Sequence, residues 1–287
     1  MMERLAKPDW LRIRLGNNAA FSTTGNVIKS RRLHTICESG RCPNLGECWN
    51  RKTATFMIAG EICTRNCKFC NTLSGKPLPL DENEPQKTAE SIRELELKHA
   101  VITSVDRDDL SDGGAMHWQS TILKIKELNP NTTLEVLIPD FRGKPESLNL
   151  IIETKPEIIT HNIETVRRLT PLVRSVAQYK TSLSVLKQIA AAGIRCKSGL
   201  MLGLGETEDE IHETLHDLYA AGCRFLSIGQ YLQPSKKNIP VVAYIHPDKF
   251  AQYKADALAL GFRYVESGPL VRSSYHSCDF VSEATSK

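Results

Sequence analysis

The order of its apolar segments constrains the fold of this 287-residue chain more than any other feature. Six short runs rich in β-branched residues are predicted strands: 54–59, 100–105, 133–138, 158–163, 199–204 and 225–232. After the first, segments with helical periodicity follow at 88–97, 115–128, 145–153, 165–173, 182–192 and 208–221. Strands that alternate with helices predict parallel βαβ units, and the nearly continuous apolar strands predict a sheet covered on both faces.

The number of units predicts the α/β class and an open, partial (β/α)6 TIM-like barrel, because about six units are fewer than a complete barrel has. A doubly wound sheet stays the alternative, since periodicity does not reveal curvature. In both architectures ligands bind at the carboxyl ends of the strands. We expect a barrel core at 53–262, preceded by an extension at 1–52 and followed by a C-terminal segment at 263–287.

Several predicted helices carry recognisable end signals. Gly193, Gly222 and Gly261 each follow a helical run and are expected to supply the left-handed turn back to the sheet. Thr207 followed by Glu210 predicts a capping box at the start of the helix that precedes Gly222.

Composition excludes several classes of protein. No apolar run approaches the length of a membrane span, and the net charge of +4 is spread along the chain instead of forming a basic stripe for nucleic acid. The N-terminal sequence lacks the features of a signal or transit peptide, so we expect a cytoplasmic protein that binds neither membrane nor nucleic acid. In that compartment the odd number of cysteines favours reduced, metal-binding thiols over disulfides.

Six of the nine cysteines form two groups of three. Cys63, Cys67 and Cys70 follow the first predicted strand with C-x3-C-x2-C spacing, so they are expected at the carboxyl edge of the sheet. A structural zinc site is closed by four protein ligands, whereas a 4Fe–4S cluster on three thiolates leaves one iron open. A zinc knuckle completed by a histidine is the alternative, although His34 and His99 lie far from zinc-finger spacing.

With Phe69 directly before its last cysteine, this loop resembles the radical S-adenosylmethionine superfamily. In that superfamily the open iron binds the amino and carboxylate groups of S-adenosylmethionine, and an electron from the cluster cleaves the molecule to methionine and a 5′-deoxyadenosyl radical. The resemblance implies a 4Fe–4S cluster on Cys63, Cys67 and Cys70, with S-adenosylmethionine bound beside it.

Polar residues at the other strand ends are the candidates to bind S-adenosylmethionine. A hydroxyl pair and a carboxylate after the second strand would hold the ammonium, an amide and a carboxylate after the fourth would hold the ribose, and a lysine in the fifth would pair with the carboxylate. These residues are, in that order, Thr103, Ser104, Asp106, Asn162, Glu164 and Lys197. A solvated acidic turn is the alternative for Asp106.

Longer strings resemble the lipoyl synthase family over nearly the whole chain. They include LHTICESGRCPNLGECW, TATFMIAGEICTRNCKFC, VITSVDRDDLSDGGA, HNIETV, GLMLGLGET, YLQPS and GPLVRSSYH. The resemblance implies that Cys37, Cys42 and Cys48 bind an auxiliary 4Fe–4S cluster in the extension, and that Ser273 of the C-terminal segment closes over it as the fourth ligand. A hard oxygen is a weak ligand for such an iron and would be released readily.

The same resemblance implies an activity. Two sulfur atoms from the auxiliary cluster would be inserted at carbons six and eight of a protein-bound octanoyl-lysine, with two S-adenosylmethionines consumed. Expected partners are octanoylated lipoyl carrier domains (2-oxoacid dehydrogenase E2 subunits and the glycine cleavage H protein), an electron donor such as flavodoxin or ferredoxin, and an iron–sulfur carrier protein. The alternatives are another radical sulfur insertase, acting on a small molecule or tRNA, and a non-catalytic iron–sulfur protein.

The chain departs from the family in one short motif. The family usually has a histidine two residues before the PV that follows QPS, and here Asn238 stands in that place. A contact made through that side chain is therefore expected to differ. Cys196, Cys223 and Cys278 match no ligand position, and the first two are expected to be small buried residues.

Overall fold

The computed structural model describes residues 5–12, 19–50 and 53–282. The chain divides into two compact units: unit 1 comprises Met1–Ile13, Cys67–Cys70 and Ile159–Lys287, and unit 2 comprises Arg14–Asn66 and Asn71–Ile158. The elements in chain order are η1 (Asp9–Leu11), α1 (Ala19–Ser30), β1 (His34–Thr35), α2 (Ile36–Ser39), α3 (Leu45–Asn50), β2 (Thr55–Ile58), β3 (Ile62–Cys63), β4 (Leu73–Ser74), α4 (Glu84–Glu94), β5 (His99–Ser104), α5 (Ala115–Leu128), β6 (Thr133–Leu137), η2 (Phe141–Gly143), α6 (Pro145–Glu153), β7 (Ile158–Thr160), α7 (Thr170–Val173), α8 (Tyr179–Ala191), β8 (Arg195–Leu202), α9 (Glu208–Ala220), β9 (Phe225–Gln230), α10 (Pro247–Leu260), β10 (Tyr264–Gly268) and α11 (Ser277–Ser282).

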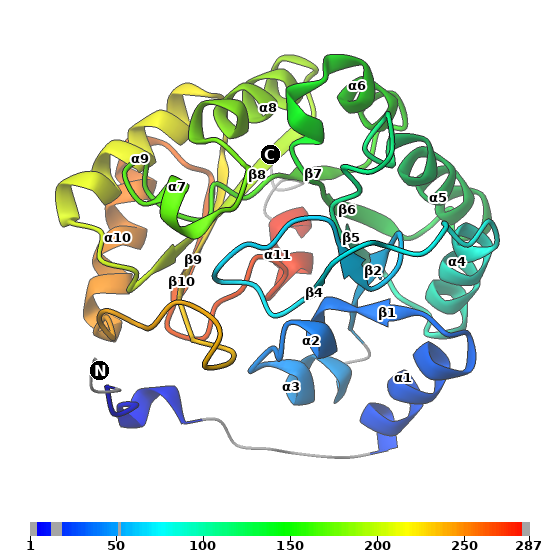
Figure 1. Ribbon diagram of the computed structural model, residues 1–287, viewed down its shortest axis with the longest axis horizontal. Coiled ribbons are helices and arrows are strands. Elements are labelled where there is room, and N and C mark those ends of the chain that lie inside the picture. Colours follow the sequence, from blue (N-terminus) through cyan, green and yellow to red (C-terminus); the bar gives the residue numbers. More distant parts are fainter. Residues whose placement is uncertain (1–4, 13–18, 51–52, 283–287) are drawn as a thin grey trace. The chain divides into compact units, whose positions relative to one another are not determined.

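Unit 2 is built on three parallel strands, β2, β5 and β6, with the short β1 antiparallel to β2 at the edge. Helices α4, α5 and α6 run beside these strands (Figure 1). All four residues of β2 are buried, as are Ala100–Val101 and Ile102 of β5, because the strands are covered on both faces.

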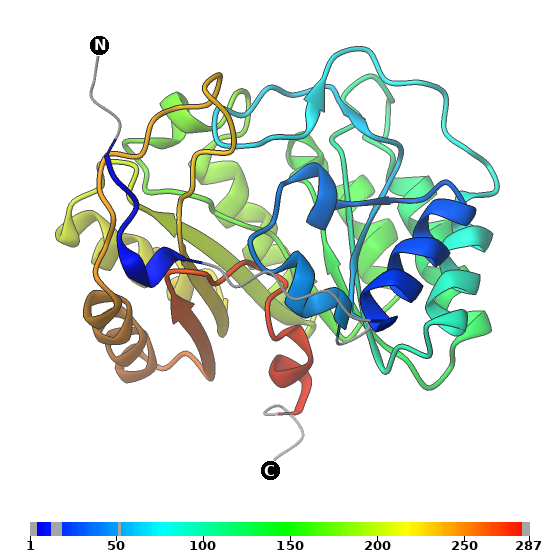
Figure 2. The ribbon, with the colours of Figure 1, turned by 90° about the horizontal axis from the view of Figure 1, so that it is seen from below.

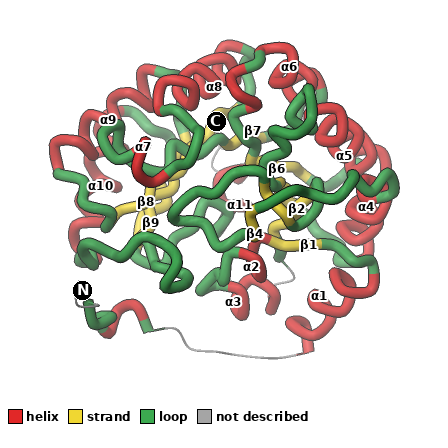
Figure 3. The backbone as a smooth tube through the Cα atoms, viewed as in Figure 1, coloured by secondary structure: helices red, strands yellow, loops and turns green. Residues whose placement is uncertain are grey.

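Unit 1 continues the same pattern with β8, β9 and β10, which pair in parallel. Helices α8, α9 and α10 alternate with these strands along the chain, as the red and yellow segments of Figure 3 show. Every residue of β9 is buried. Each unit therefore has the βα repeat that the sequence predicts, with helices returning the chain from one parallel strand to the next.

Most predicted elements are confirmed. The six predicted strands correspond to β2, β5, β6, β7, β8 and β9, and two predicted helices match α5 (Ala115–Leu128) and α6 (Pro145–Glu153) at both ends. The βα repeat also includes α10 and β10. The only part of this unit predicted from the sequence is the end of the helix at Gly261. Cys196 and Cys223 are buried and Cys278 is exposed, so the expectation for the first two is confirmed.

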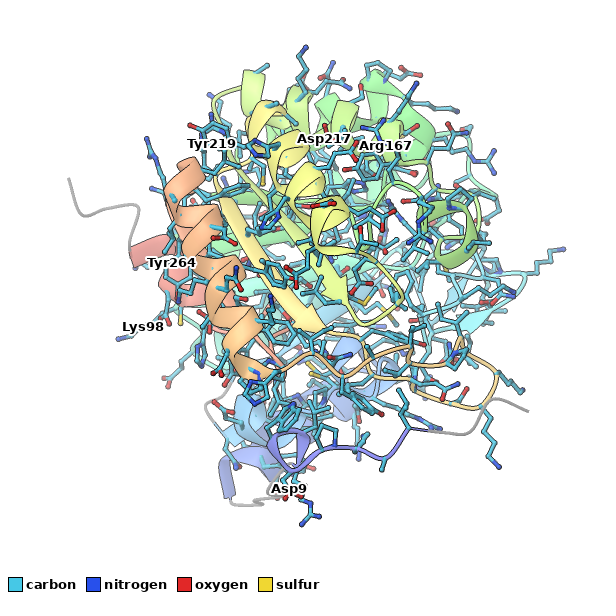
Figure 4. The ribbon with its side chains drawn as sticks, turned by 90° about the vertical axis from the view of Figure 1, so that its left-hand side faces the viewer. Asp9, Lys98, Arg167, Asp217, Tyr219 and Tyr264 are labelled. Carbon is cyan, nitrogen blue, oxygen red and sulfur yellow. The ribbon has the colours of Figure 1, made fainter. Side chains whose placement is uncertain are left out.

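The helix predicted at 165–173 is wrong for most of its length, because only α7 (Thr170–Val173) is helical. The preceding residues form a loop whose two arginines bind α9. Arg167 Nη2 lies 2.9 Å from Asp217 Oδ2, and Arg168 Nε lies 2.7 Å from Glu210 Oε1. Figure 4 shows Arg167 and Asp217 next to each other on the outer side of unit 1. The segment instead forms a turn, in which the Leu169 N–H donates to the Val166 carbonyl at 3.1 Å, and the two ion pairs join this turn to α9.

The predicted helix ends are confirmed. Thr207 accepts from the Glu210 N–H at 3.3 Å and Glu210 accepts from the Thr207 N–H at 2.8 Å, which is a complete capping box. Gly193, Gly222 and Gly261 all have left-handed φ angles, of +76°, +88° and +112°. They differ in their surroundings, because a Cβ on Gly222 would lie 2.5 Å from Ala190 Cβ whereas one on Gly193 would meet nothing within 4 Å.

The amino ends of the strands in unit 1 are covered by α11 (Figure 2). The ring of Phe280 lies 4.5 Å from the ring of Tyr264 and 6.3 Å from that of Phe225, the first residues of β10 and β9. Helix α11 therefore packs on the edge of the sheet opposite to the one where ligands bind in parallel α/β folds. Within the described ranges, no helix is both long and apolar enough to span a bilayer.

We predict that Gly222→Ala destabilises the protein more than Gly193→Ala. Both replacements force alanine into the left-handed region, at about 1–2 kcal/mol each. Gly222→Ala also forces a methyl group against Ala190, which adds about 1–3 kcal/mol. Urea unfolding of the two variants measures the difference, and equal losses of stability would contradict the packing argument.

Candidate functional site

The cysteine-rich loop leaves β2 through two residues in the left-handed region, Ala59 (φ 67°) and Gly60 (φ 94°). Buried Glu84 holds this bend: its Oε2 accepts from the Ala59 N–H at 2.7 Å and lies 2.6 Å from His117 Nε2. The loop is closed at its base by pairing of β3 with β4, in which Cys63 aligns with Ser74. Cys63 therefore begins the loop on a fixed segment of backbone.

Cys63 is surrounded by backbone donors. Its Sγ accepts from the N–H groups of Arg65 and Asp106, both at 3.3 Å. The Thr64 N–H donates to the Asp106 carbonyl at 3.1 Å, which joins the loop to the chain that leaves β5. Two N–H groups directed at one sulfur stabilise a thiolate, the form in which cysteine binds iron.

Arg65 ties the loop to three aspartates at the carboxyl ends of β5 and β6. Its side chain is 4% exposed, and its nitrogens lie 3.2 Å from Asp106 Oδ1, 2.7 Å from Asp108 Oδ2 and 2.7 Å from Asp140 Oδ1. The pairing with Asp108 is two-pronged, since Nη2 also donates to Oδ1 at 2.9 Å. One guanidinium thus fixes the ends of two neighbouring strands relative to the start of the cysteine loop.

The electrostatics of Asp108 follow from this contact. Burial alone would raise the pKa of Asp108, but the hydrogen bonds and charges of Arg65 and Arg142 outweigh it and lower the pKa below its ordinary value. Arg142 contributes from outside, with Nε 3.1 Å from Asp108 Oδ1 and a side chain that is 60% exposed. Asp108 is therefore held ionised as the partner of Arg65.

Cys67 and Cys70 belong to unit 1. Cys67 Sγ lies 3.7 Å from Ser175 Oγ, and the Lys68 N–H donates to the Val173 carbonyl at 2.8 Å. The Cys70 carbonyl accepts from the side-chain amide of Asn238 at 2.7 Å. Asn238, the residue that departs from the family motif, therefore makes a direct contact with the cysteine loop.

In the first triplet, Cys37 lies on α2, Cys48 lies on α3, and Cys42 lies between the two helices of unit 2. Thr35 caps α2 by accepting from the Glu38 N–H at 3.3 Å, and the Cys42 N–H donates to the Cys37 carbonyl at 3.0 Å. The pKa of Cys37 is raised to about 11, mainly by burial and in part by Cys42, and the pKa of Cys48 is raised to about 12, mainly by burial and in part by Cys37 and Cys42. The three thiols are thus close enough to interact electrostatically, and metal must displace their protons to bind.

The donor set of each triplet fits a 4Fe–4S cluster better than a single zinc ion. Each triplet offers three thiols, and soft sulfurs are the usual ligands of iron–sulfur clusters, whereas a structural zinc ion takes four protein ligands.

Of the predicted S-adenosylmethionine contacts, three lie at the end of β5. The Thr103 hydroxyl donates to the Leu137 carbonyl at 3.1 Å, and Ser104 Oγ accepts from Trp118 Nε1 at 3.1 Å. Asp106 has one carboxylate oxygen at Arg65 and the other 3.7 Å from Cys63 Sγ. The structure brings Asp106 to Cys63, whereas Thr103 and Ser104 already bond within the fold.

Asn162 and Glu164 lie together after β7. The Asn162 amide donates to Glu164 Oε1 at 3.1 Å, while Asn162 Oδ1 is buried without a hydrogen-bond partner among the described residues. Burial raises the pKa of Glu164, opposed by the charge of Arg174 and the amide of Asn162. Gly199 is required beside them, because a Cβ there would lie 2.7 Å from Asn162 Oδ1. An unpartnered buried oxygen fits a site where a ligand supplies the donor.

Lys197 lies two residues before Gly199 on β8, and its carbonyl accepts from the N–H of His161 at 3.0 Å. It aligns with Phe225, the first residue of β9, and its Nζ lies 3.6 Å from the centre of the Phe280 ring. This is the edge of the sheet covered by α11, not the carboxyl edge. The predicted contact of Lys197 with the carboxylate of S-adenosylmethionine therefore gains no support from its position.

The structure also describes the two remaining predicted residues, Phe69 and Ser273. Phe69 is half-buried in the cysteine loop. Ser273 is half-buried in the turn between β10 and α11, in a different unit from Cys37, Cys42 and Cys48. Its role as fourth ligand stays a prediction.

Comparison with known proteins decides the family. The model of the Radical SAM superfamily matches residues 57–218. The chain is 62% identical to lipoyl synthase of Phocaeicola vulgatus and 61% identical to that of Parabacteroides distasonis, over 96% of this chain and 97% and 99% of theirs. The chain belongs to the lipoyl synthase family. The resemblance identified from the cysteine motifs is confirmed, and lipoyl synthases are sulfur-inserting radical enzymes that use 4Fe–4S clusters and S-adenosylmethionine.

Solved structures confirm the fold class. SuiB of Streptococcus suis, bound to S-adenosylmethionine, aligns with 78% of this chain at a TM-score of 0.59 and 10% identity. Methylornithine synthase aligns with 80% at a TM-score of 0.53 and 12% identity. The chain spans about half of the length of SuiB, 54%. At such identities the likeness concerns the fold alone, which is the α/β partial barrel of radical S-adenosylmethionine enzymes.

Arg65, Glu84 and Asp140 were not predicted from the sequence. The available signal for Arg65 was its place between the cysteines of the loop, together with three aspartates that follow later strands. Glu84 gave none, because a glutamate at the start of a helix is ordinary.

We predict that Arg65→Lys destabilises the apoprotein much more than Arg142→Lys. Both arginines contact Asp108, but only Arg65 is buried among three carboxylates. Lysine keeps the positive charge but cannot reproduce the two-pronged bond, so buried hydrogen bonds are lost at a cost of about 1–3 kcal/mol, against about 0–1 kcal/mol for the exposed contact. Urea unfolding without iron measures both, and a loss for Arg65→Lys no larger than that for Arg142→Lys would refute the anchoring role.

Proposed function

We propose that this protein synthesises the lipoyl group by inserting two sulfur atoms at carbons six and eight of an octanoyl-lysine on a lipoyl carrier domain. The observation that carries the proposal is 62% identity over 96% of the chain to a lipoyl synthase, with both cysteine triplets present. When bound, the clusters and S-adenosylmethionine supply the electron, the radical that removes hydrogen, and the sulfur.

The chain's own residues supply position in this proposal. Cys63, Cys67 and Cys70 hold the cluster that binds S-adenosylmethionine, and Arg65 orients Cys63 by fixing its loop to the ends of β5 and β6. Asn162 and Glu164 present a buried oxygen and a carboxyl for the nucleoside. Hydrogen abstraction by a radical requires no acid–base residue, so the absence of a nucleophile–histidine pair from the motifs is consistent with the reaction.

Cys37, Cys42 and Cys48 hold the auxiliary cluster, with Ser273 as its fourth ligand. In this proposal residues 1–52 form the extension that carries the auxiliary site, 53–262 form the barrel, and 263–287 bring Ser273 to that site. An oxygen ligand suits an iron that must be released, because iron in such clusters prefers sulfur.

The substrates in this proposal are octanoylated E2 subunits of 2-oxoacid dehydrogenases and the glycine cleavage H protein, and the protein acts in the cytoplasm. A flavodoxin or ferredoxin supplies electrons one at a time, and an iron–sulfur carrier protein rebuilds the spent cluster. The chemistry needs a low-potential reductant and consumes sulfur, and the named partners are those that the family resemblance implies.

The function is tested by incubating the anaerobically reconstituted protein with an octanoyl-lysine peptide, S-adenosylmethionine and dithionite. Mass spectrometry should show the peptide mass rising in two steps of one sulfur each, with 5′-deoxyadenosine formed. Cleavage of S-adenosylmethionine without any sulfur in the peptide would point to a different radical reaction.

We predict that replacing Cys63, Cys67 or Cys70 by Ala abolishes formation of 5′-deoxyadenosine, a loss of at least about a hundredfold, because the cluster keeps too few ligands. Exposed Cys278→Ala is the control and should retain activity. The nucleoside is measured by chromatography after anaerobic reconstitution. Undiminished cleavage in any of the three variants would remove that cysteine from the cluster.

We predict that replacing Cys37, Cys42 or Cys48 by Ala preserves part of the cleavage of S-adenosylmethionine but stops sulfur insertion. Ser273→Cys should retain the auxiliary cluster and slow insertion, because a fourth thiolate binds iron more firmly than a hydroxyl. Ser274→Cys is the matched control at the next residue. A thiolated peptide from a cysteine variant, or equal rates for the two serine variants, would contradict the assignment.

A further inference from the structure

The segment 233–239, called the clamp segment here, is ordered by its own hydrogen bonds. Ser235 Oγ donates to Asn238 Oδ1 at 2.7 Å, and Gln233 Nε2 donates to the Asn238 carbonyl at 2.7 Å. The Asn238 N–H donates to the Ser235 carbonyl at 3.1 Å. The bond from Ser235 Oγ occupies the side-chain oxygen of Asn238 and thereby fixes the orientation of its amide.

With its oxygen facing Ser235, the amide directs its nitrogen at the cysteine loop. Asn238 Nδ2 donates to the Cys70 carbonyl at 2.7 Å across 168 residues of sequence. The adjacent peptide continues the contact, because the Ile239 N–H donates to the Lys68 carbonyl at 3.1 Å. All of these residues belong to unit 1.

The clamp segment is in turn anchored to the sheet. Tyr231, which directly follows β9, donates from its hydroxyl to the Ile239 carbonyl at 2.7 Å, and its side chain is buried. On the other side, the Lys68 N–H donates to the Val173 carbonyl at 2.8 Å. The backbone of residues 68–70 is thus held from two directions, and the side chain of Asn238 makes the bond nearest to a cysteine.

We propose that Asn238 is a positioning residue for the cluster loop, acting through the carbonyl of Cys70 and not through contact with the reacting atoms. Its neutral amide is a hydrogen-bond donor, and so is an imidazole N–H of the histidine that the family motif usually has at this place. The identity of the bound cluster rests on the proposed function, whereas the hold on the loop is a property of the apoprotein. Asn238→Asp separates the two bonds of the amide, because a carboxylate still accepts from Ser235 but donates nothing to Cys70.

Hydrogen exchange of the apoprotein, read on peptides that contain Lys68 and Cys70, is the first test. Asn238→Ala and Asn238→Asp should each speed exchange there by about fivefold, the factor expected when one hydrogen bond of ordinary strength is lost. Asn238→His should restore protection, because an imidazole N–H can donate to the same carbonyl. Gln188→Ala is the matched control, since that exposed amide bonds to the Ser184 carbonyl within α8.

Redox titration of the reconstituted cluster, followed by electron paramagnetic resonance, is the second test. Asn238→Asp should lower the midpoint potential, because it places a negative charge beside a ligand residue, whereas Asn238→His should retain a potential close to that of the unmodified protein. A merely structural role elsewhere in the fold would leave the potential of a correctly loaded cluster unchanged.

Unchanged exchange at Lys68 and Cys70 in Asn238→Ala and Asn238→Asp would overturn the inference, as would an unshifted potential in Asn238→Asp. If Asn238→Ala fails to fold, Ser235→Ala tests the same contact by releasing the amide, and it should also speed exchange. If the unmodified protein cleaves S-adenosylmethionine but transfers no sulfur, the proposed function fails while the exchange result still decides the role of Asn238.

Discussion

In unit 2, the position of the cysteine loop depends on the ion pairs that the guanidinium of Arg65 makes. Three carboxylates from two strand ends converge on it, and its side chain is almost fully buried. Leaving any of these charges unpaired would be costly, so the loop and the strand ends form together or not at all. The bend at Ala59, held by Glu84, then directs the chain from β2 into this network.

The two parts of the cysteine loop are held by different means. Around Cys63 the loop is held by the ion pairs of Arg65 with its aspartates and by backbone N–H groups. Around Cys70 it is held by neutral hydrogen bonds, from the Asn238 amide and from backbone N–H groups. Because the Arg65 pairs are buried, salt screens them only weakly, and amide–carbonyl bonds carry no net charge to screen.

The order of strands and helices could be predicted from the sequence, because apolar periodicity and glycine at helix ends are local signals. Tertiary contacts could not be predicted: residues 165–169 form a bend and turn instead of the predicted helix, and Arg167 and Arg168 of this segment bind α9. The cysteine ligands were found by spacing and by resemblance. The role of Lys197 stays a prediction, because a sequence shows that this lysine lies in a strand but not that its side chain packs against Phe280 of α11. Arg65 and Asn238 gained their roles only when partners 43 and 168 residues away became visible.

The ammonium of Lys197 against the ring of Phe280 has a consequence for how unit 1 completes its fold. Lys197 is fully buried, and part of its cover comes from α11, the last described helix. Before that helix packs, the charge can stay hydrated at the amino ends of the strands; once the helix packs, the aromatic face of Phe280 is one of the contacts of the buried ammonium. A chain that ended before Phe280 would therefore leave this ammonium exposed to water at the amino ends of the strands. The C-terminal segment thus covers part of the sheet of unit 1, independently of any ligand that its serine provides.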